Sequence, residues 1–233
     1  MKFTLPPLSV FFPAYNEEKN ITATVSKADK VLQKLKIKSE IIIINDGSKD
    51  KTAEVSKQLV NKFPNVKLVN QDNGGYGMAL RAGFENAKNE WIVYTDADGQ
   101  FDFSEVSKFL YATKEADYII GYRISRQDPF YRLIFAKLWA LSVFILFGIW
   151  VKDMDCGFKM INRKVLKKIP PLQSTRGAMI NAELLIKTKK AGFRIAQIGV
   201  NHYPRTAGVP SGASIRVIIQ SYLDLFKLWL QLR

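Results

Sequence analysis

The chain has very few of the residues on which several common kinds of site depend. Its 233 residues include one cysteine, Cys156, and one histidine, His202. A single cysteine excludes an internal disulfide and suits a reducing compartment, while a single histidine excludes a zinc site built from several histidines. No apolar run reaches the ~20 residues of a membrane-spanning helix, and the N-terminus lacks the apolar segment of a secretion signal. We therefore expect a cytoplasmic protein whose chemistry depends on carboxylates, arginine and lysine.

Acidic residues are scarce relative to basic ones. The sequence has 35 lysines and arginines against 21 aspartates and glutamates, which gives a formal net charge of +14. Such a charge predicts an anionic partner, a class that includes nucleic acid, anionic lipid and phosphorylated substrates. No nucleic-acid-binding motif is present and the basic residues are scattered, so a non-catalytic nucleic-acid-binding module is only a remote alternative. Because 47% of the residues are hydrophobic and 24% are charged, we expect one well-packed domain over residues 1–233.

Short apolar runs alternate with segments of helical spacing through the first half of the chain. The runs predict strands at 8–12, 40–45, 66–70, 91–95 and 118–122, and the segments between them predict helices at 18–35, 51–63, 76–87 and 104–114. This alternation is typical of a Rossmann-like α/β fold with a mainly parallel sheet and flanking helices. Later residues predict a helix near 138–151, another at 178–191, a strand at 194–202 and an amphipathic helix at 215–233. The apolar stripe predicted for that last helix consists of Ile215, Ile218, Ile219, Tyr222, Phe226, Trp229 and Leu230.

Polar and glycine-rich segments follow four of the predicted strands. They lie at 13–17, 46–48, 73–77 and 96–100. In open α/β sheets the ligand sits beyond the carboxyl ends of the strands, where loops converge and helix N-termini point inward. We therefore expect these four loops to face one crevice.

A pair of aspartates, Asp96 and Asp98, stands at the end of the fourth predicted strand. Alternation along an extended backbone would place both carboxylates on one side, with Gln100 as a third oxygen at the same period. Hard oxygen ligands of this kind select Mg²⁺ or Mn²⁺. A departing diphosphate needs such a cation, because negative charge builds up on it in the transition state. The alternative interpretation is a solvated acidic loop.

Several motifs taken together resemble family 2 glycosyltransferases, in particular dolichyl-phosphate mannose synthases and related polyprenyl-phosphate glycosyltransferases. The matching segments, in order along almost the whole chain, are 13–18, 45–48, 73–77, 96–100, 121–123, 153–158 and 204–208. The resemblance implies a GT-A-type domain and an inverting, metal-dependent hexosyltransferase. The donor would be a GDP- or UDP-linked sugar and the acceptor a polyprenyl phosphate, dolichyl or undecaprenyl. Residues 1–122 would form the nucleotide-sugar half and residues 123–233 the acceptor half.

The resemblance also assigns residues to the donor site. By it Asp46 would contact the base and Pro13, Tyr15 and Glu17 would line the base and ribose pocket. Local alternatives remain, since Pro13 could end a strand, Asp46 could cap a helix and the glycines near Gly75 could form an ordinary turn. The residues implied for the nucleotide sugar are Pro13, Tyr15, Glu17, Asp46, Gly75, Asp96 and Ala97.

On the acceptor side the resemblance implies that Arg123, Arg132 and Arg205 bind phosphate. Arginine suits this role because its planar fork donates two parallel hydrogen bonds. The chain lacks a serine four residues beyond Arg132, where some relatives have one. Asp153 or Asp155 matches an acidic residue of the family, and either would act as general base if the acceptor were a saccharide hydroxyl. An ionised phosphate needs no base, so Asp153 would then orient arginines or metal ligands, unless it only caps a turn.

Two apolar helical segments near the end of the chain allow two interpretations. Residues 138–151 and 215–233 could both be ordinary core helices. Their tryptophans, Trp139, Trp150 and Trp229, stand near basic residues, which is also typical of helices at the interface of an anionic membrane. A lipid-borne acceptor favours peripheral attachment to the cytoplasmic face of a membrane. Whether a separate membrane protein anchors the chain stays open.

Overall fold

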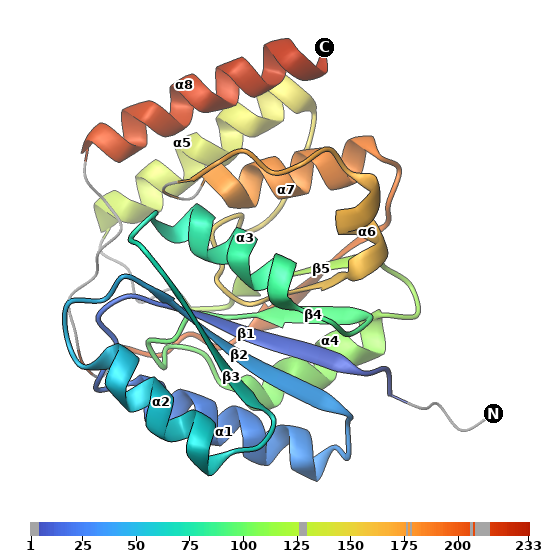
Figure 1. The fold of residues 1–233 in the computed structure, drawn as a ribbon. Coiled ribbons are helices and arrows are strands. Elements are labelled where there is room, and N and C mark those ends of the chain that lie inside the picture. Colours follow the sequence, from blue (N-terminus) through green and yellow to red (C-terminus); the bar gives the residue numbers. More distant parts are fainter. Residues whose placement is uncertain (1–4, 126–129, 176, 178, 206, 208–214) are drawn as a thin grey trace.

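The computed structural model describes residues 5–125, 130–175, 177, 179–205, 207 and 215–233. Its centre is one seven-stranded sheet with the order β3-β2-β1-β4-β6-β5-β7 (Figure 1). The strands are β1 (Leu8–Ala14), β2 (Ser39–Asp46), β3 (Val66–Gln71), β4 (Trp91–Tyr94), β5 (Tyr118–Arg123), β6 (Lys159–Asn162) and β7 (Ile195–Val200). The expected α/β architecture is confirmed, and every strand predicted from the sequence is present within a few residues of its expected bounds.

Helices cover both faces of the sheet. The helical elements are α1 (Ile21–Lys34), α2 (Thr52–Lys62), α3 (Tyr76–Asn86), the 3₁₀ turn η1 (Phe103–Glu105), α4 (Val106–Ala112), α5 (Phe130–Phe147), α6 (Arg163–Lys168), α7 (Met179–Lys190) and α8 (Ile215–Leu232). Figure 1 shows α1, α2 and α4 on one face and α3, α6 and α7 on the other, with α5 and α8 outermost. Two cores result, because alternate residues of each strand face opposite ways: Phe11 belongs to one core, and Val10 and Phe12 to the other.

Among the described residues, β6 is the strand that the sequence pattern missed. It pairs antiparallel with β4 on one side and with β5 on the other, whereas β1 pairs in parallel with β2 and β4. Its four residues follow a polar turn and include only two apolar ones, Met160 and Ile161, so they do not form the apolar run by which β4 was predicted. Because β6 lies between β4 and β5, the turn before β6 is beside the end of β4. Asp96 and Asp98 follow shortly after that end.

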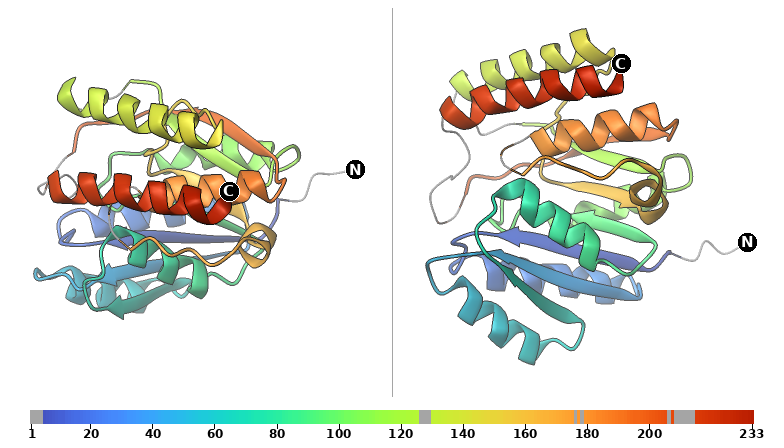
Figure 2. Two further views of the ribbon diagram at one scale, coloured as in Figure 1. Left: turned by 90° about the horizontal axis from the view of Figure 1, so that it is seen from above. Right: turned by 45° about the horizontal axis from the view of Figure 1, so that its top comes forward.

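Helices α5 and α8 lie side by side as an outer layer over α7 (Figure 2). The amphipathic helix predicted at 215–233 is confirmed as α8, and several residues of its apolar stripe face outward rather than into the core. Leu225 and Leu228 are buried, whereas Ile219, Phe226 and Leu230 are exposed. The helix is apolar around more than one face, so spacing alone could not identify the face that packs. In the part of the chain that the structure describes, no helix combines the length and hydropathy needed to cross a membrane.

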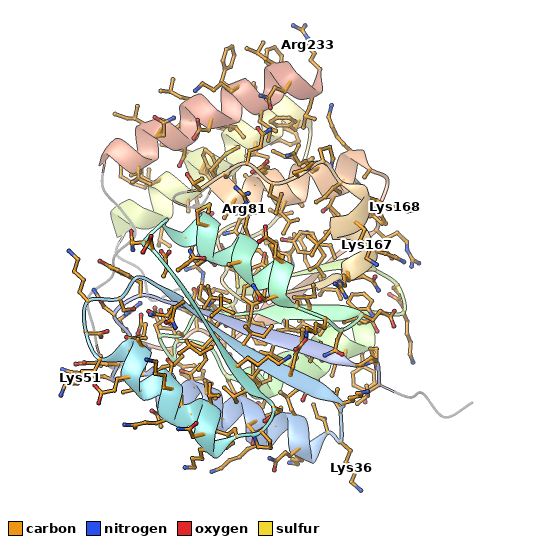
Figure 3. All side chains as sticks on the ribbon, viewed as in Figure 1. Lys36, Lys51, Arg81, Lys167, Lys168 and Arg233 are labelled. Carbon is orange, nitrogen blue, oxygen red and sulfur yellow. The ribbon has the colours of Figure 1, made fainter. Side chains whose placement is uncertain are left out.

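Among the described residues, basic side chains are spread over different sides of the molecule. Figure 3 labels Lys36, Lys51, Lys168 and Arg233, which lie on different sides of the molecule. This scatter, already evident in the sequence, gives no continuous stripe for a nucleic-acid backbone to follow. The positive charge therefore acts mainly as a general attraction toward anions.

Candidate functional site

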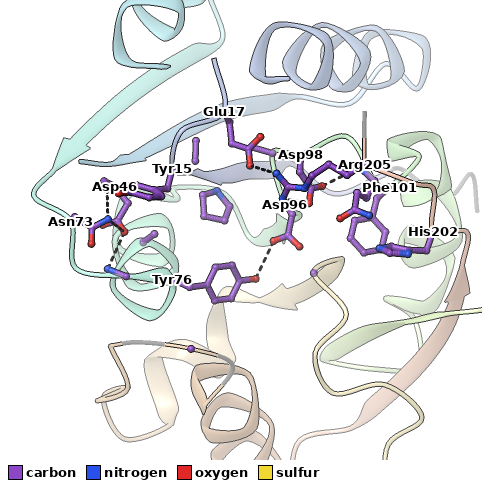
Figure 4. Close-up of a pocket in the computed structure, with 18 of the residues that line it drawn as sticks. Tyr15, Glu17, Asp46, Asn73, Tyr76, Asp96, Asp98, Phe101, His202 and Arg205 are labelled. Carbon is purple, nitrogen blue, oxygen red and sulfur yellow. Dashed lines mark hydrogen bonds and ion pairs between the residues drawn. The ribbon is translucent and has the colours of Figure 1, made fainter. Parts of the chain in front are cut away.

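A cavity of about 440 Å³ opens beyond the carboxyl ends of the strands. Four loops that follow β1, β2, β3 and β4 contribute to it, as the sequence predicted. Figure 4 shows Asp46 and Asn73 at one end of the cavity and Asp96, Asp98 and Arg205 at the other. The predicted site residues that line it are Pro13, Tyr15, Glu17, Asp46, Gly75, Asp96, Ala97, Asp98, Gln100, Arg123 and Arg205.

Two predicted residues do not line this cavity, and the side chain of a third lies outside the described residues. Neither Asp153 nor Asp155 lines the cavity in the described part of the chain. Arg132 lies in the first turn of α5, and its side chain is outside the described residues. The cavity wall therefore contains Arg123 and Arg205, two of the arginines expected to bind the acceptor. It contains neither of the two aspartates that could act as a general base.

The wall also contains residues that sequence reasoning did not select. Tyr76, Phe101, Gly157 and His202 all line the cavity. Gly157 lies in a segment that carried the family resemblance, and Tyr76 begins α3 directly after the glycine loop, so their neighbourhood was visible in the sequence. Phe101 and His202 meet through an isolated antiparallel bridge between distant segments. No local pattern could have indicated that contact.

The two aspartates follow β4 rather than lying within it, and Asp98 is part of a turn. Strand β4 ends at Tyr94, and Gly99 adopts a φ of +75°, which favours glycine. The carboxylate of Asp98 accepts the backbone N–H of Gln100 at 3.0 Å, which stabilises the turn. The predicted alternation is thus wrong for these residues, yet the turn still directs both carboxylates into the cavity.

Asp96 lies in a setting that penalises its negative charge. Burial and the nearby charge of Asp98 raise the pKa of Asp96 to about 7, although Lys159 and Arg123 act in the opposite direction. The hydroxyl of Tyr76 donates to Asp96 Oδ1 at 3.3 Å, and burial together with Asp96 raises the pKa of this phenol. An anionic pair of this kind would be stabilised by a divalent cation.

The donor set fits Mg²⁺ or Mn²⁺ as a metal shared with a substrate. Within the described residues there is no group of three or more histidine, cysteine, aspartate or glutamate side chains that could hold a metal alone. Magnesium is commonly held by one or two carboxylates while phosphate and water oxygens complete its shell. Asp96 and Asp98 suit that arrangement. The side-chain amide of Gln100 donates to the carbonyl of Tyr203 at 3.0 Å, so part of this side chain is already engaged.

Arg205 joins two loops of the cavity. Its guanidinium donates to Glu17 Oε1 at 3.1 Å and to Asp98 Oδ2 at 2.8 Å. Burial raises the pKa of Glu17 above its ordinary value, and the nearby positive charge of Arg205 offsets only part of this rise. A residue from the end of the chain therefore neutralises carboxylates that follow β1 and β4.

Arg123 and Asp153 form a buried, two-pronged ion pair. Arg123 Nε donates to Asp153 Oδ2 at 2.7 Å and Nη2 donates to Oδ1 at 2.9 Å. The two side chains are 9% and 4% exposed. Bidentate contacts of this type fix orientation as well as charge. Asp153 thus holds Arg123 at the edge of the cavity.

Asp46 organises the glycine loop. Its Oδ1 accepts the backbone N–H of Gly74 and the side-chain amide of Gln71, at 2.9 Å and 2.7 Å. Its Oδ2 accepts the N–H of Gly75 at 2.9 Å. Gly75 adopts a φ of +86°, a conformation that side chains disfavour, and directly precedes the N-terminus of α3. A helix N-terminus presented in this way suits a phosphate group.

A buried lysine supports the turn behind Asp96. Lys159 is 1% exposed, and its ammonium donates to the carbonyl of Cys156 and, at 3.1 Å, to Asn181 Oδ1. It thereby connects β6 to the segment that contains Gly157. Sequence reasoning did not select Lys159, since most lysines are exposed and nothing local indicated its burial.

The seven-stranded sheet and the helices that flank it form the GT-A fold. A solved structure of glucosyl-3-phosphoglycerate synthase from Mycobacterium tuberculosis, in complex with Mn²⁺, UDP and glucosyl-3-phosphoglycerate, has the same fold. The TM-score is 0.73 at 19% identity, and the match covers 97% of this chain and 85% of that one. Another solved structure of that enzyme contains Mg²⁺ and UDP.

Residues 9–170 match the family described as Glycosyl transferase family 2. A dolichyl-phosphate beta-glucosyltransferase of Trichomonas vaginalis is 31% identical over 219 residues, which are 85% of this chain and 67% of that protein. The undecaprenyl-phosphate 4-deoxy-4-formamido-L-arabinose transferase of Aeromonas hydrophila is 30% identical over 162 residues, which are 68% of this chain and 50% of that protein. The chain spans about two thirds of the length of the dolichyl-phosphate glucosyltransferases that it matches. The chain belongs to glycosyl transferase family 2, and it is a glycosyltransferase.

Proposed function

We propose that the chain transfers one sugar from a nucleoside-diphosphate sugar to a polyprenyl phosphate, with inversion at the anomeric carbon. Relatives named for dolichyl-phosphate and undecaprenyl-phosphate acceptors support this acceptor class. UDP in the related structures supports a uridine nucleotide as donor, and a guanosine nucleotide remains the alternative. Residues 1–122 would supply most of the donor site and residues 123–233 most of the acceptor site.

The observation that carries the acceptor proposal is the pairing of Asp153 with Arg123. A hydroxyl acceptor needs a carboxylate that is free to take its proton. Asp153 is instead engaged by both nitrogens of the Arg123 fork and is absent from the cavity wall, as is Asp155. A phosphate acceptor is already nucleophilic at neutral pH and needs cations to guide it. Arg123 and Arg205 line the cavity and can serve that purpose.

In this proposal each group has one task. Tyr15, Pro13 and Asn73 surround the nucleoside, and the N-terminus of α3 faces phosphate oxygens. Asp96 and Asp98, with Gln100 nearby, would hold Mg²⁺ or Mn²⁺, which when bound neutralises the departing diphosphate. An acceptor phosphate oxygen attacks the anomeric carbon as the bond to the diphosphate breaks.

Helices α5 and α8 support a location at a membrane surface. Their outer faces expose apolar side chains at helical spacing: Ile134, Leu138, Leu141 and Ile145 on α5, and Ile219, Leu223, Phe226 and Leu230 on α8. Apolar patches of this kind mark surfaces that bind a protein or a membrane. With a basic chain and a lipid-borne acceptor, we propose peripheral binding to an anionic membrane surface. Two further points stay predictions: that this surface is the cytoplasmic face of the membrane, and that a separate protein anchors the chain there.

The test is an acceptor assay with radiolabelled UDP-sugars and GDP-sugars in the presence of Mn²⁺. Label should enter the organic phase only when polyprenyl phosphate is supplied, and chelation with EDTA should prevent the transfer. Asp98→Ala should lower turnover by about 100-fold or more, because it removes one carboxylate that would hold the metal. Transfer to a soluble saccharide, with none to the lipid phosphate, would instead establish the hydroxyl-acceptor alternative.

A further inference from the structure

The carboxylate of Asp98 already pairs with a positively charged side chain, the guanidinium of Arg205. Arg205 donates through Nη2 to Asp98 Oδ2 at 2.8 Å, and the side chain of Asp98 is 7% exposed. Asp98 is one of the two carboxylates that would hold the metal. A partly buried ion pair of this length is a substantial interaction, which any other cation must replace before it can use the same oxygen.

The position of Arg205 leaves one of its donors unused. Its Nε is buried and has no hydrogen-bond partner among the described residues. Burying an N–H group without an acceptor is unfavourable. The guanidinium is therefore incompletely satisfied beside Asp98, and a ligand that could engage Nε together with the terminal nitrogens would bind it better.

Glu17 provides a second contact that does not involve a metal-binding carboxylate. Arg205 Nη1 donates to Glu17 Oε1 at 3.1 Å, and Glu17 is itself held by the side-chain amide of Asn20 at 2.6 Å. Arg205 could therefore leave Asp98 while staying at the cavity wall. A divalent cation on Asp98 would drive that movement, because two positive groups within a few ångströms of each other repel in a low-dielectric site.

We propose that Arg205 is the resident counter-ion of Asp98 before metal binding, and that the arriving divalent cation displaces it into the cavity to bind the acceptor phosphate. The second step rests on the proposed function, whereas the first concerns only this chain and the metal. The arrangement also sets an order. The metal binds first, and the arginine fork becomes available to the acceptor afterwards.

The first experiment measures the Mn²⁺ affinity of the nucleotide-free protein from the electron paramagnetic resonance signal of unbound Mn²⁺. Arg205→Gln removes the competing charge and should tighten Mn²⁺ binding by about three- to tenfold, the range for one partly buried ion pair. Arg205→Lys, which keeps the charge, should stay near the wild-type value. Arg194→Gln is the matched control, since Arg194 pairs with Asp117 and its side chain is 63% exposed, outside the cavity.

An unchanged or weaker Mn²⁺ affinity in Arg205→Gln would overturn the displacement, whatever the enzyme transfers. The second experiment measures binding of farnesyl phosphate by calorimetry, with and without Mn²⁺ and UDP. Wild-type protein should bind it several-fold more tightly when both are present, and Arg205→Gln should lose that gain. An equal gain in both proteins would overturn the second step. If saccharides rather than lipid phosphates accept sugar, the proposed function fails, and the Mn²⁺ titration still decides the displacement.

Discussion

Gly157 lies directly against the carboxylate of Asp96. A Cβ atom at position 157 would be 2.1 Å from Asp96 Oδ2 and 2.6 Å from its Cγ. Contacts of that length do not occur in folded proteins, so one partner would have to move. The free end of the Asp96 side chain moves more easily than the backbone of residue 157. The turn before β6 therefore determines where this carboxylate can stand.

We predict that Gly157→Ala lowers kcat by about tenfold or more, because displacement of a reacting group by around 1 Å can cost that much. Steady-state assays at saturating Mn²⁺ would measure the effect. Gly192→Ala is the control. Its φ of +78° strains any side chain, but no atom crowds its Cβ, so it should cost about 1 kcal/mol of stability and leave kcat unchanged. Wild-type kcat in Gly157→Ala would contradict the prediction.

The raised pKa of Asp96 predicts a pH-dependent stability of the metal-free protein. In the folded chain Asp96 keeps its proton up to a pKa of about 7, whereas an unfolded carboxyl loses it near the ordinary value of 3.8. The folded state therefore binds more protons between these values, and this contribution to stability is lost as pH rises toward 7. Asp96→Asn lacks this contribution.

The comparison is made by urea unfolding in EDTA at pH 5, 6, 7 and 8. Relative to wild type, Asp96→Asn should gain stability as pH rises from 5 to 7 and then level off. The difference between the two free energies of unfolding at each pH removes the contribution of titrating groups that both proteins share. A difference that is independent of pH would show that Asp96 titrates normally in the folded protein.

Asp153→Asn distinguishes a positioning role from a general base. If Asp153 only orients Arg123, the substitution should raise KM for the lipid phosphate and lower kcat by about tenfold or less, since the amide still accepts one hydrogen bond. A general base would produce a loss of about 100-fold or more and would remove the acidic limb of the pH profile of kcat. Arg123→Lys should resemble the smaller effect, because lysine cannot form the two-pronged contact.

The outer face of α8 should contribute to membrane binding. We predict that Leu223→Ser with Phe226→Ser lowers binding to vesicles containing anionic lipid by about tenfold or more, since burial of each side chain contributes about 1.5–3 kcal/mol. Co-sedimentation at fixed lipid concentration would measure it. Tyr111→Ser is the control, because Tyr111 is 69% exposed on α4, away from this face. A similar loss in all variants would argue against a membrane role of α8.

Local patterns were sufficient to predict every described strand except β6, and the loops that form the cavity. Strands such as β2 are runs of isoleucine, and the loops after them contain the aspartates and glycines that end strands and begin helices. Because parallel strands direct their carboxyl ends to one edge, the convergence of Tyr15, Asp46 and Asp96 followed from topology alone.

Contacts between distant segments could not be predicted in the same way. The pairing of Arg123 with Asp153 depends on β6, a strand too short to give a periodic signal. The pairing of Arg205 with Asp98 joins residues 107 positions apart. The face of α8 that packs inward could not be predicted either, because the buried Leu225 and Leu228 lie outside the apolar stripe that the sequence indicates. Such features depend on tertiary packing rather than on local preference.

The position of β6 in the sheet affects how the protein is made. Within the described residues β5 pairs only with β6 and β7, and both follow it in the sequence. During synthesis β5 must wait for Lys159–Asn162 before it can join β4 through β6. The side of the sheet that presents Arg123 is therefore completed only after β7 has been synthesised, so it folds later than the side formed by β1, β2 and β3.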